Sequence, residues 1–481
     1  MSRTNDPGRS VLTNWQAGVA ALLTLAGFLA AGHALLNKRD PRAALGWCAI
    51  CLMVPLLGAI LYVLFGINRV RSRARRLQLQ ERNIPSGPEE VGEARASDLA
   101  GHLAELARLS GSLQQWPLTG GNLVKPLRNG EEAFPAMLSA LNEAQTRISL
   151  SSYIFDTDDT GRAFVDALAA AGERGVDVRV LVDGVGELYA WPHASRLLRK
   201  RGVPVRRFAP PTLIPPSIHF NLRNHRKILV VDGKVGFAGG MNIGDRHLAD
   251  RPGGRPALDM HFRFDGPVVA QLEQAFFEDW ERAGGQIPEI APEEPADAGP
   301  ARCRVLTDGP GEDMDKLTIL LSGAVSLARQ RVLIMTPYFL PPRELMGALV
   351  SAALRGVEVS VILPEKNNLP YVHWATSNML WELLRWGVRV FYQPGHFNHS
   401  KLFIVDDSYV QVGSANLDPR SLRLNFELAV EIFDAAFSAA LVEHCMETRE
   451  RSREVVLEDV DGRPLPVKLR DSIVWLFSPY L

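Results

Sequence analysis

The chain begins with two long apolar runs, and the rest alternates apolar and polar positions as folded domains do. Residues 17–36 and 43–67 contain no Asp, Glu, Lys or Arg. Their lengths, 20 and 25 residues, match the roughly 20 residues that a helix needs to cross a bilayer. A cleaved signal peptide would explain the first run alone, but not a second run so close behind it. We therefore predict a transmembrane helical hairpin over residues 1–76, with spans at about 15–36 and 43–67.

Basic residues flank the second run and predict its orientation. Five arginines lie between residues 69 and 76, directly after it. Such clusters stay on the cytoplasmic side of a membrane, so we expect the remainder of the chain to face the cytoplasm. Lys38, Arg39 and Arg42 in the connector between the runs oppose this orientation.

The pattern of strands and helices beyond residue 117 occurs twice. Residues 77–117 are polar, and we interpret them as a tether. After them, residues 148–155 and 332–339 are apolar strand-like runs that end in aromatics, and each is followed by a helical pattern, a glycine and a valine-rich strand. We predict a duplicated α/β fold with lobes at 118–290 and 300–481, each a mixed β-sheet flanked by helices.

Composition excludes some classes of function. The net charge of −1 gives no general basic field, which disfavours a nucleic acid as partner. Cys48 and Cys51 lie within an apolar run, and Cys303 and Cys445 stand alone. These four cysteines indicate neither a disulfide framework nor a zinc site.

Two matching sets of reactive residues occupy equivalent positions in the two repeats. One set alone would be weak support for catalysis, but two sets at equal spacing are hard to explain as packing. On a strand, the histidine and the lysine two residues later project from the same face, as binding of one phosphate requires. A neutral imidazole is a nucleophile near pH 7, while lysine and asparagine can stabilise charge on phosphoryl oxygens without a metal or other cofactor. The candidate catalytic residues are His225, Lys227, Asp232, His399, Lys401 and Asp406, and the candidate phosphate-binding residues are Asn242, Asn416 and Ser414.

These motifs resemble the duplicated histidine-lysine-aspartate signature of the phospholipase D superfamily. The resemblance implies two lobes that meet at one site, a covalent phosphohistidine and no metal. It also implies acids that orient the histidines, which would be Glu427 and Asp259, although Asp259 could instead be an exposed strand carboxylate. Asp232 and Asp406 precede turns, and a structural role as turn-forming residues is an equal alternative.

The apolar hairpin, residues 37–47 and the C-terminal residues 477–481 resemble bacterial cardiolipin synthases with two N-terminal spans. This resemblance implies a multi-pass enzyme of the bacterial inner membrane whose partners are phosphatidylglycerol and cardiolipin. His225 would attack one phosphatidylglycerol and release glycerol, and His399 would act as general acid and then base, although the reverse assignment stays open. Hydrolysis by a membrane-bound phospholipase D and, less readily, a superfamily nuclease are the alternatives. Residues 209–220, an insertion before the first motif, would either enter the membrane interface or close the core.

Overall fold

The computed structural model describes residues 7–38, 41–66, 99, 101–213, 216–217, 222–251, 254, 256–288, 296–310 and 315–478. The chain divides into two compact units, Met1–Arg76 and Leu77–Leu481. The arginines at 69–76, most of the expected tether and part of the 209–220 insertion lie outside the described residues.

The N-terminal unit contains one helix long enough to cross a membrane, among the residues that the structure describes. Helix α1 (Pro7–Asn37) includes the apolar segment Trp15–Asn37, whose mean hydropathy is 2.0. The second expected span, residues 43–67, is not one helix: α2 (Pro41–Met53) ends at a bend, and α3 (Pro55–Leu61) and a π-helical turn, η1 (Tyr62–Gly66), follow it. Pro55 cannot donate the backbone hydrogen bond that would continue α2, so it begins a new helix. At about 1.5 Å per residue, neither α2 nor α3 is long enough to cross a bilayer alone.

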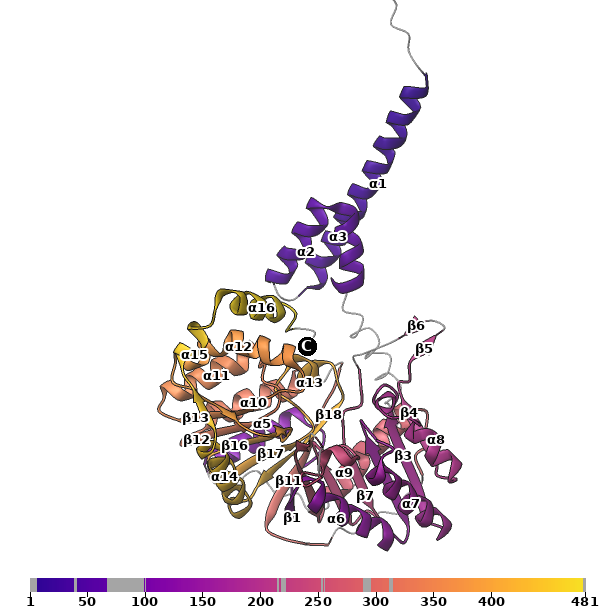
Figure 1. Cartoon of the computed structure of the whole chain (residues 1–481), viewed down its shortest axis with the longest axis vertical. Coiled ribbons are helices and arrows are strands. Elements are labelled where there is room, and N and C mark those ends of the chain that lie inside the picture. The colour runs from indigo at the N-terminus through magenta and orange to yellow at the C-terminus, as the bar shows by residue number, and fades with distance from the viewer. Residues whose placement is uncertain are drawn as a thin grey trace, which may run out of the picture. The chain divides into compact units, whose positions relative to one another are not determined.

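The C-terminal unit is built on one sheet that runs through both lobes (Figure 1). The strand order of the first lobe, β1-β10-β8-β7-β2-β3-β4, is repeated in the second as β11-β18-β17-β16-β12-β13-β14, with β19 added at the edge. In each lobe the last three strands of this order are parallel and the others are antiparallel. The antiparallel pairing of β1 with β11 joins the lobes. The strands are β1 (Thr119–Arg128), β2 (Arg147–Ser152), β3 (Asp177–Asp183), β4 (Val205–Phe208), β7 (Ile228–Val231), β8 (Val235–Gly239), β10 (Met260–Asp265), β11 (Ala301–Asp308), β12 (Arg331–Met335), β13 (Glu358–Pro364), β14 (Arg389–Gln393), β16 (Leu402–Val405), β17 (Tyr409–Gly413), β18 (Glu427–Phe433) and β19 (Arg453–Val455).

Helices cover both faces of this sheet. The outer face of the first lobe packs against helices α6 (Asn129–Glu143), α7 (Asp159–Glu173) and α8 (Ala194–Lys200). The corresponding face of the second lobe packs against α10 (Lys316–Leu327), α11 (Arg343–Leu354) and α12 (Pro370–Leu384). On the other face, α9 (Val268–Arg282) and α14 (Ala435–Glu450) bury apolar side chains from both lobes in a shared core. The predicted fold class, duplicated α/β lobes with mixed sheets, is confirmed for this unit.

Helix α5 (His102–Leu113) lies within the range expected to be a tether, yet it packs on the second lobe. Leu106 and Ala107 are buried in the core of that lobe. The Ser110 hydroxyl donates a 2.8 Å hydrogen bond to Glu431, which is fully buried beside Arg304. Because burial and polar contacts fix α5, it is part of the second lobe's structure.

Candidate active site

The two motif histidines are held at the lobe interface by hydrogen bonds from the opposite lobe. His225, which precedes β7, donates its backbone N–H to the carbonyl of Phe426 in the second lobe at 2.9 Å. His399 follows the short strand β15 (Phe397–Asn398), which pairs with β9 (Ala257–Leu258) of the first lobe. The backbone N–H of His399 donates to the carbonyl of Leu258 at 2.6 Å. Both histidines therefore depend on the junction between the lobes for their position.

The predicted orienting acids are exchanged between the lobes in the same way. Nδ1 of His225 donates to Oε2 of Glu427 at 3.0 Å, and Nδ1 of His399 donates to Oδ2 of Asp259 at 2.8 Å. Both carboxylates are fully buried, whereas each imidazole keeps 12% of its side chain exposed. Because Nδ1 carries the proton that the carboxylate accepts, Nε2 is left as the free nitrogen of each neutral ring. Glu427 and Asp259 thus lie where the sequence predicts them, but each contacts the histidine of the other lobe.

The motif lysines contact the same two histidines. Nζ of Lys227 donates to the carbonyl of His225 at 2.6 Å, and Nζ of Lys401 lies 3.0 Å from Nδ1 of His399. Burial lowers the pKa of Lys227 to about 7 and the pKa of Lys401 to about 8. Burial therefore destabilises each ammonium, and an anion bound beside it would stabilise its charge.

Burial lowers the pKa of both motif histidines, whereas the pKa values of their two acids shift in opposite directions. Burial lowers the pKa of His225, although Glu427 opposes this change. Burial, Lys401 and Lys227 hold the pKa of His399 well below its usual value. Burial raises the pKa of Glu427, but His225, Lys227 and Ser414 together bring it below its ordinary value, whereas burial leaves the pKa of Asp259 raised. In the free protein both imidazoles are neutral near pH 7, and Glu427 is the more firmly ionised acid.

The asparagines and Ser414 follow strands β8 and β17 and have unequal roles. Asn242 accepts a 3.1 Å hydrogen bond from the backbone N–H of Ile154 through Oδ1, so its amide nitrogen is the group that remains to contact a ligand. Asn416 donates to Ser421 at 3.3 Å. Ser414 does not face the cavity: its hydroxyl donates to Oε2 of Glu427 at 2.5 Å, and 1% of the residue is exposed. The equivalent residue in the first lobe, Gly240, has no hydroxyl to offer Asp259.

The motif aspartates lie away from the histidines. Asp232 follows β7 and accepts hydrogen bonds from the backbone of residues 145–147. Asp406 follows β16 and accepts from the backbone of residues 329–331 and from Nε2 of His102 at 2.9 Å. Each is separated from its histidine by a strand that advances about 3.3 Å per residue, so neither carboxylate reaches the site. We therefore propose that Asp232 and Asp406 form turns, which is the structural alternative for these two residues.

A single cavity of about 1270 Å³ connects the two halves of the site. His225, His399, Asn242 and Asn416 all line it. Further polar residues from both lobes line it at positions that no sequence motif marks, among them Asp156, Arg246, His247, Tyr338, Lys366, Asp418 and Arg420. His247 supports the site without titrating near pH 7, because it accepts from the backbone N–H of Asn242 and burial lowers its pKa to about 3. Among the described side chains, no group of three or more His, Cys, Asp and Glu residues could hold a metal ion.

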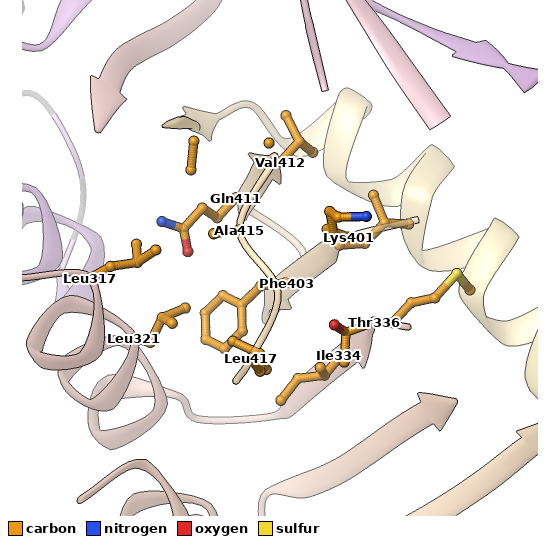
Figure 2. A pocket seen from close by; sticks show the side chains of 14 residues that line it. Leu317, Leu321, Ile334, Thr336, Lys401, Phe403, Gln411, Val412, Ala415 and Leu417 are labelled. Atoms are coloured by element: carbon orange, nitrogen blue, oxygen red, sulfur yellow. The ribbon is translucent and has the colours of Figure 1, made fainter. Parts of the chain in front are cut away.

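A second, apolar cavity of about 30 Å³ lies behind β16 (Figure 2). The side chains of Leu321, Phe403 and Leu417 surround it, and the Lys401 ammonium points away from them. This cavity has room for about one water molecule, so it is a packing defect rather than a substrate site. The apolar wall explains why the Lys401 stem is buried while its charge is directed to His399.

Two lobes with exchanged acids, paired lysines and two neutral imidazoles on one cavity define a phospholipase D-like phosphoryl-transfer enzyme. The family model "Cardiolipin synthase, PLD-like domain" matches residues 137–280 and 321–448, and the model "Phospholipase_D-nuclease N-terminal" matches residues 25–66. The chain belongs to the cardiolipin synthase family of phospholipase D-like phosphatidyltransferases.

Similar proteins support this assignment along almost the whole chain. Cardiolipin synthase A of Pseudomonas putida KT2440 is 37% identical over 473 residues, which cover 96% of this chain and 97% of that protein. Cardiolipin synthase A of Pseudomonas entomophila is 35% identical over 471 residues, with 96% and 97% covered. The crystal structure of a phosphatidylserine synthase from Haemophilus influenzae has a TM-score of 0.60 at 17% identity and covers 78% of this chain and all of that one, which shows the shared fold.

Proposed function

We propose that this chain joins two phosphatidylglycerol molecules into cardiolipin and releases glycerol, through a phosphohistidine intermediate. The observation that carries the proposal is that two imidazoles from opposite lobes, each anchored through Nδ1, line one cavity. Family membership supports the choice of a phosphatidyl group and of a second phosphatidylglycerol as acceptor.

In this proposal His225 is the nucleophile. Its Nε2 attacks the phosphorus of the first lipid, and glycerol leaves with a proton from His399. His399 then removes the proton from the glycerol hydroxyl of the second lipid, which attacks the phosphohistidine. The ionised Glu427, supported by Ser414, stabilises positive charge that develops on His225. The negative phosphodiester raises the affinity of His399 for the proton that it must donate. Lys227, Lys401, Asn242 and Asn416 would hold the phosphoryl oxygens.

One experiment separates this reaction from its alternatives. Purified protein is incubated with phosphatidylglycerol and a chelator, and the products are analysed by mass spectrometry. Cardiolipin with free glycerol supports the proposal, whereas phosphatidic acid alone would show a hydrolytic phospholipase D. A phosphatidyl group retained on His225 in a His399→Ala variant would identify the nucleophile, and its retention on His399 in His225→Ala would reverse the assignment.

We further propose that the N-terminal unit anchors the enzyme in the bacterial inner membrane with the lobes in the cytoplasm. The apolar helix Trp15–Asn37 supports the anchor, and the arginines at 69–76 support the orientation. A multi-pass arrangement requires that the bent α2–α3 segment also enter the bilayer, as its exposed Leu52, Met53 and Leu57 suggest. Protease accessibility of a C-terminal tag in spheroplasts tests the orientation, and digestion from outside would contradict it.

A further inference from the structure

Helix α16 (Leu465–Trp475), with the turn after it, presents an apolar face to solvent. Five large apolar side chains on it are about half to three quarters exposed: Leu465 77%, Leu469 59%, Ile473 49%, Leu476 67% and Phe477 58%. Leu465, Leu469, Ile473 and Leu476 follow one another at intervals of three or four positions, so these side chains lie on one side of the helix. Scattered exposed leucines need no explanation, but an aligned face of this kind marks an interaction surface.

Other side chains of α16 fix the helix to the second lobe. Val474 and Trp475 pack against the core of that lobe. Ser472 donates a 2.9 Å hydrogen bond to Asn378 of α12. Asp471 is 1% exposed and accepts from the guanidinium groups of Arg463 and Arg470. Because these contacts hold the helix, its apolar face points permanently outward.

Helix α12 connects α16 with the rim of the active-site cavity. Leu369, Tyr371 and Val372, at the start of α12, line the cavity, and α16 packs along α12. Figure 1 shows α16 over α12, on the same side of the C-terminal unit as the hairpin of β5 (Thr212–Leu213) and β6 (Pro216–Ser217). Across the cavity, the segment after β3 exposes Tyr189 and Trp191 by 64% and 78%, and Tyr189 also lines the cavity. Apolar surface therefore borders the opening in both lobes.

We propose that α16 is an interfacial helix that lies in the boundary between lipid headgroups and acyl chains and holds the cavity mouth against the bilayer. This inference rests on the proposed function, in which both substrates are bilayer lipids. An 11-residue helix is about 16 Å long, too short to cross a membrane but suited to lie along its surface.

The charges of α16 favour an anionic lipid surface over a second copy of the chain. Lys468 and Arg470 are its basic residues, and its one acid, Asp471, is buried and paired. Arg470 also lies over the ring of Trp374, with its guanidinium carbon 4.2 Å from the ring centroid. Two copies joined through α16 would bring like charges together, whereas phosphatidylglycerol headgroups carry the complementary charge.

The depth of α16 is measurable in the full-length protein, independently of turnover. In a Cys48→Ser background, Ile473→Cys is labelled with a fluorophore and the protein is reconstituted into phosphatidylglycerol vesicles with brominated acyl chains. The matched control is Leu354→Cys, on a leucine that is 64% exposed at the end of α11, shortly before the N-terminal end of β13. We expect several-fold stronger quenching at position 473 than at position 354. Equal quenching at the two positions, or cross-linking of two chains through the cysteine introduced at 473, overturns the proposal.

A kinetic experiment tests whether α16 affects the entry of the lipid substrate. The double substitution Leu469→Glu with Ile473→Glu is expected to lower turnover of vesicle-bound phosphatidylglycerol about tenfold, because acidic side chains leave the interface. Turnover of a short-chain phosphatidylglycerol dissolved as monomers is expected to be unchanged, as is vesicle turnover in Leu354→Glu. Equal loss on both substrates would overturn the interfacial role. If the wild-type protein makes no cardiolipin, the proposed function fails, while the quenching comparison still decides where α16 lies.

Discussion

Oε2 of Glu427 lies 3.0 Å from Nδ1 of His225, although the two residues belong to different lobes. Asp259 and His399 form the reciprocal pair at 2.8 Å. Each lobe thus supplies a histidine and the acid that orients the other lobe's histidine. The two pairs are alike in topology but differ in their surroundings, and this difference can be tested.

Glu427→Gln is expected to lower kcat about 100-fold with little change in KM. An amide cannot stabilise the positive charge that develops on His225, and removal of such orienting partners commonly costs about this much. Steady-state cardiolipin formation measures the effect, and Asp259→Asn is the matched comparison. A Glu427→Gln variant with wild-type kcat would contradict the role assigned to this acid.

Ser414→Ala is expected to shift the acidic limb of the pH profile to higher pH. The Ser414 hydroxyl helps to hold the pKa of Glu427 below its ordinary value, so its loss raises that pKa and protonates the acid at a higher pH. The shift is measured from the profile of kcat/KM between about pH 4 and pH 7, which is the range in which such acids titrate. Gly240→Ala is the contrasting change, because a Cβ there would lie 2.8 Å from both carboxylate oxygens of Asp259 and would displace that acid. An unchanged acidic limb in Ser414→Ala would show that the hydroxyl does not tune Glu427.

Activity is expected to fall as pH rises through the pKa values of the buried lysines. Lys227 at about 7 and Lys401 at about 8 lose their charge above these values and then cannot bind the phosphoryl oxygens. The alkaline limb of kcat/KM, which reports the free enzyme, should therefore begin between these values. Lys227→Arg should lower activity but weaken the first part of this decline, because a guanidinium stays protonated. A flat profile up to about pH 9 would contradict the assignment, since an unperturbed lysine titrates near 10.4.

Asp406→Ala is expected to destabilise the second lobe by about 2 kcal/mol without disabling the chemistry. It removes the acceptor of three backbone N–H groups and of His102, and unsatisfied donors cost about 1–3 kcal/mol each unless water reaches them. Urea unfolding measures the loss, and kcat of the folded protein measures the chemistry. Asp232→Ala, on the more exposed equivalent, should cost less. Loss of kcat without loss of stability would restore a catalytic role for Asp406.

The sequence predicts the duplicated fold and the site histidines because both leave local patterns. Glycine-ended helices, valine-rich strands and the equal spacing of His225–Asn242 and His399–Asn416 can be read without tertiary information. The exchange of Glu427 and Asp259 cannot be read in this way, because it depends on backbone hydrogen bonds that His225 and His399 donate to the opposite lobe and that form only when the lobes meet. Ser414 likewise looks like a phosphate ligand until the position of Glu427 is known.

The second apolar run shows a different limit of prediction from sequence. A hydropathy profile scores the side chains of residues 43–67 but does not register that Pro55 lacks a backbone N–H donor. It therefore predicts one span where the structure has two short helices. His247 reaches the cavity from a single 3-10 turn and Lys366 from a loop, and no periodic pattern marks either position. Loop residues of this kind are identified only when the scaffold that places them is known.

The pairing of β1 with β11 has a consequence for motion. Separating the two lobes would break this pairing and also the backbone hydrogen bonds that fix His225 and His399 to the opposite lobe. We therefore expect lipids to enter and leave through the mouth of the cavity rather than by separation of the lobes.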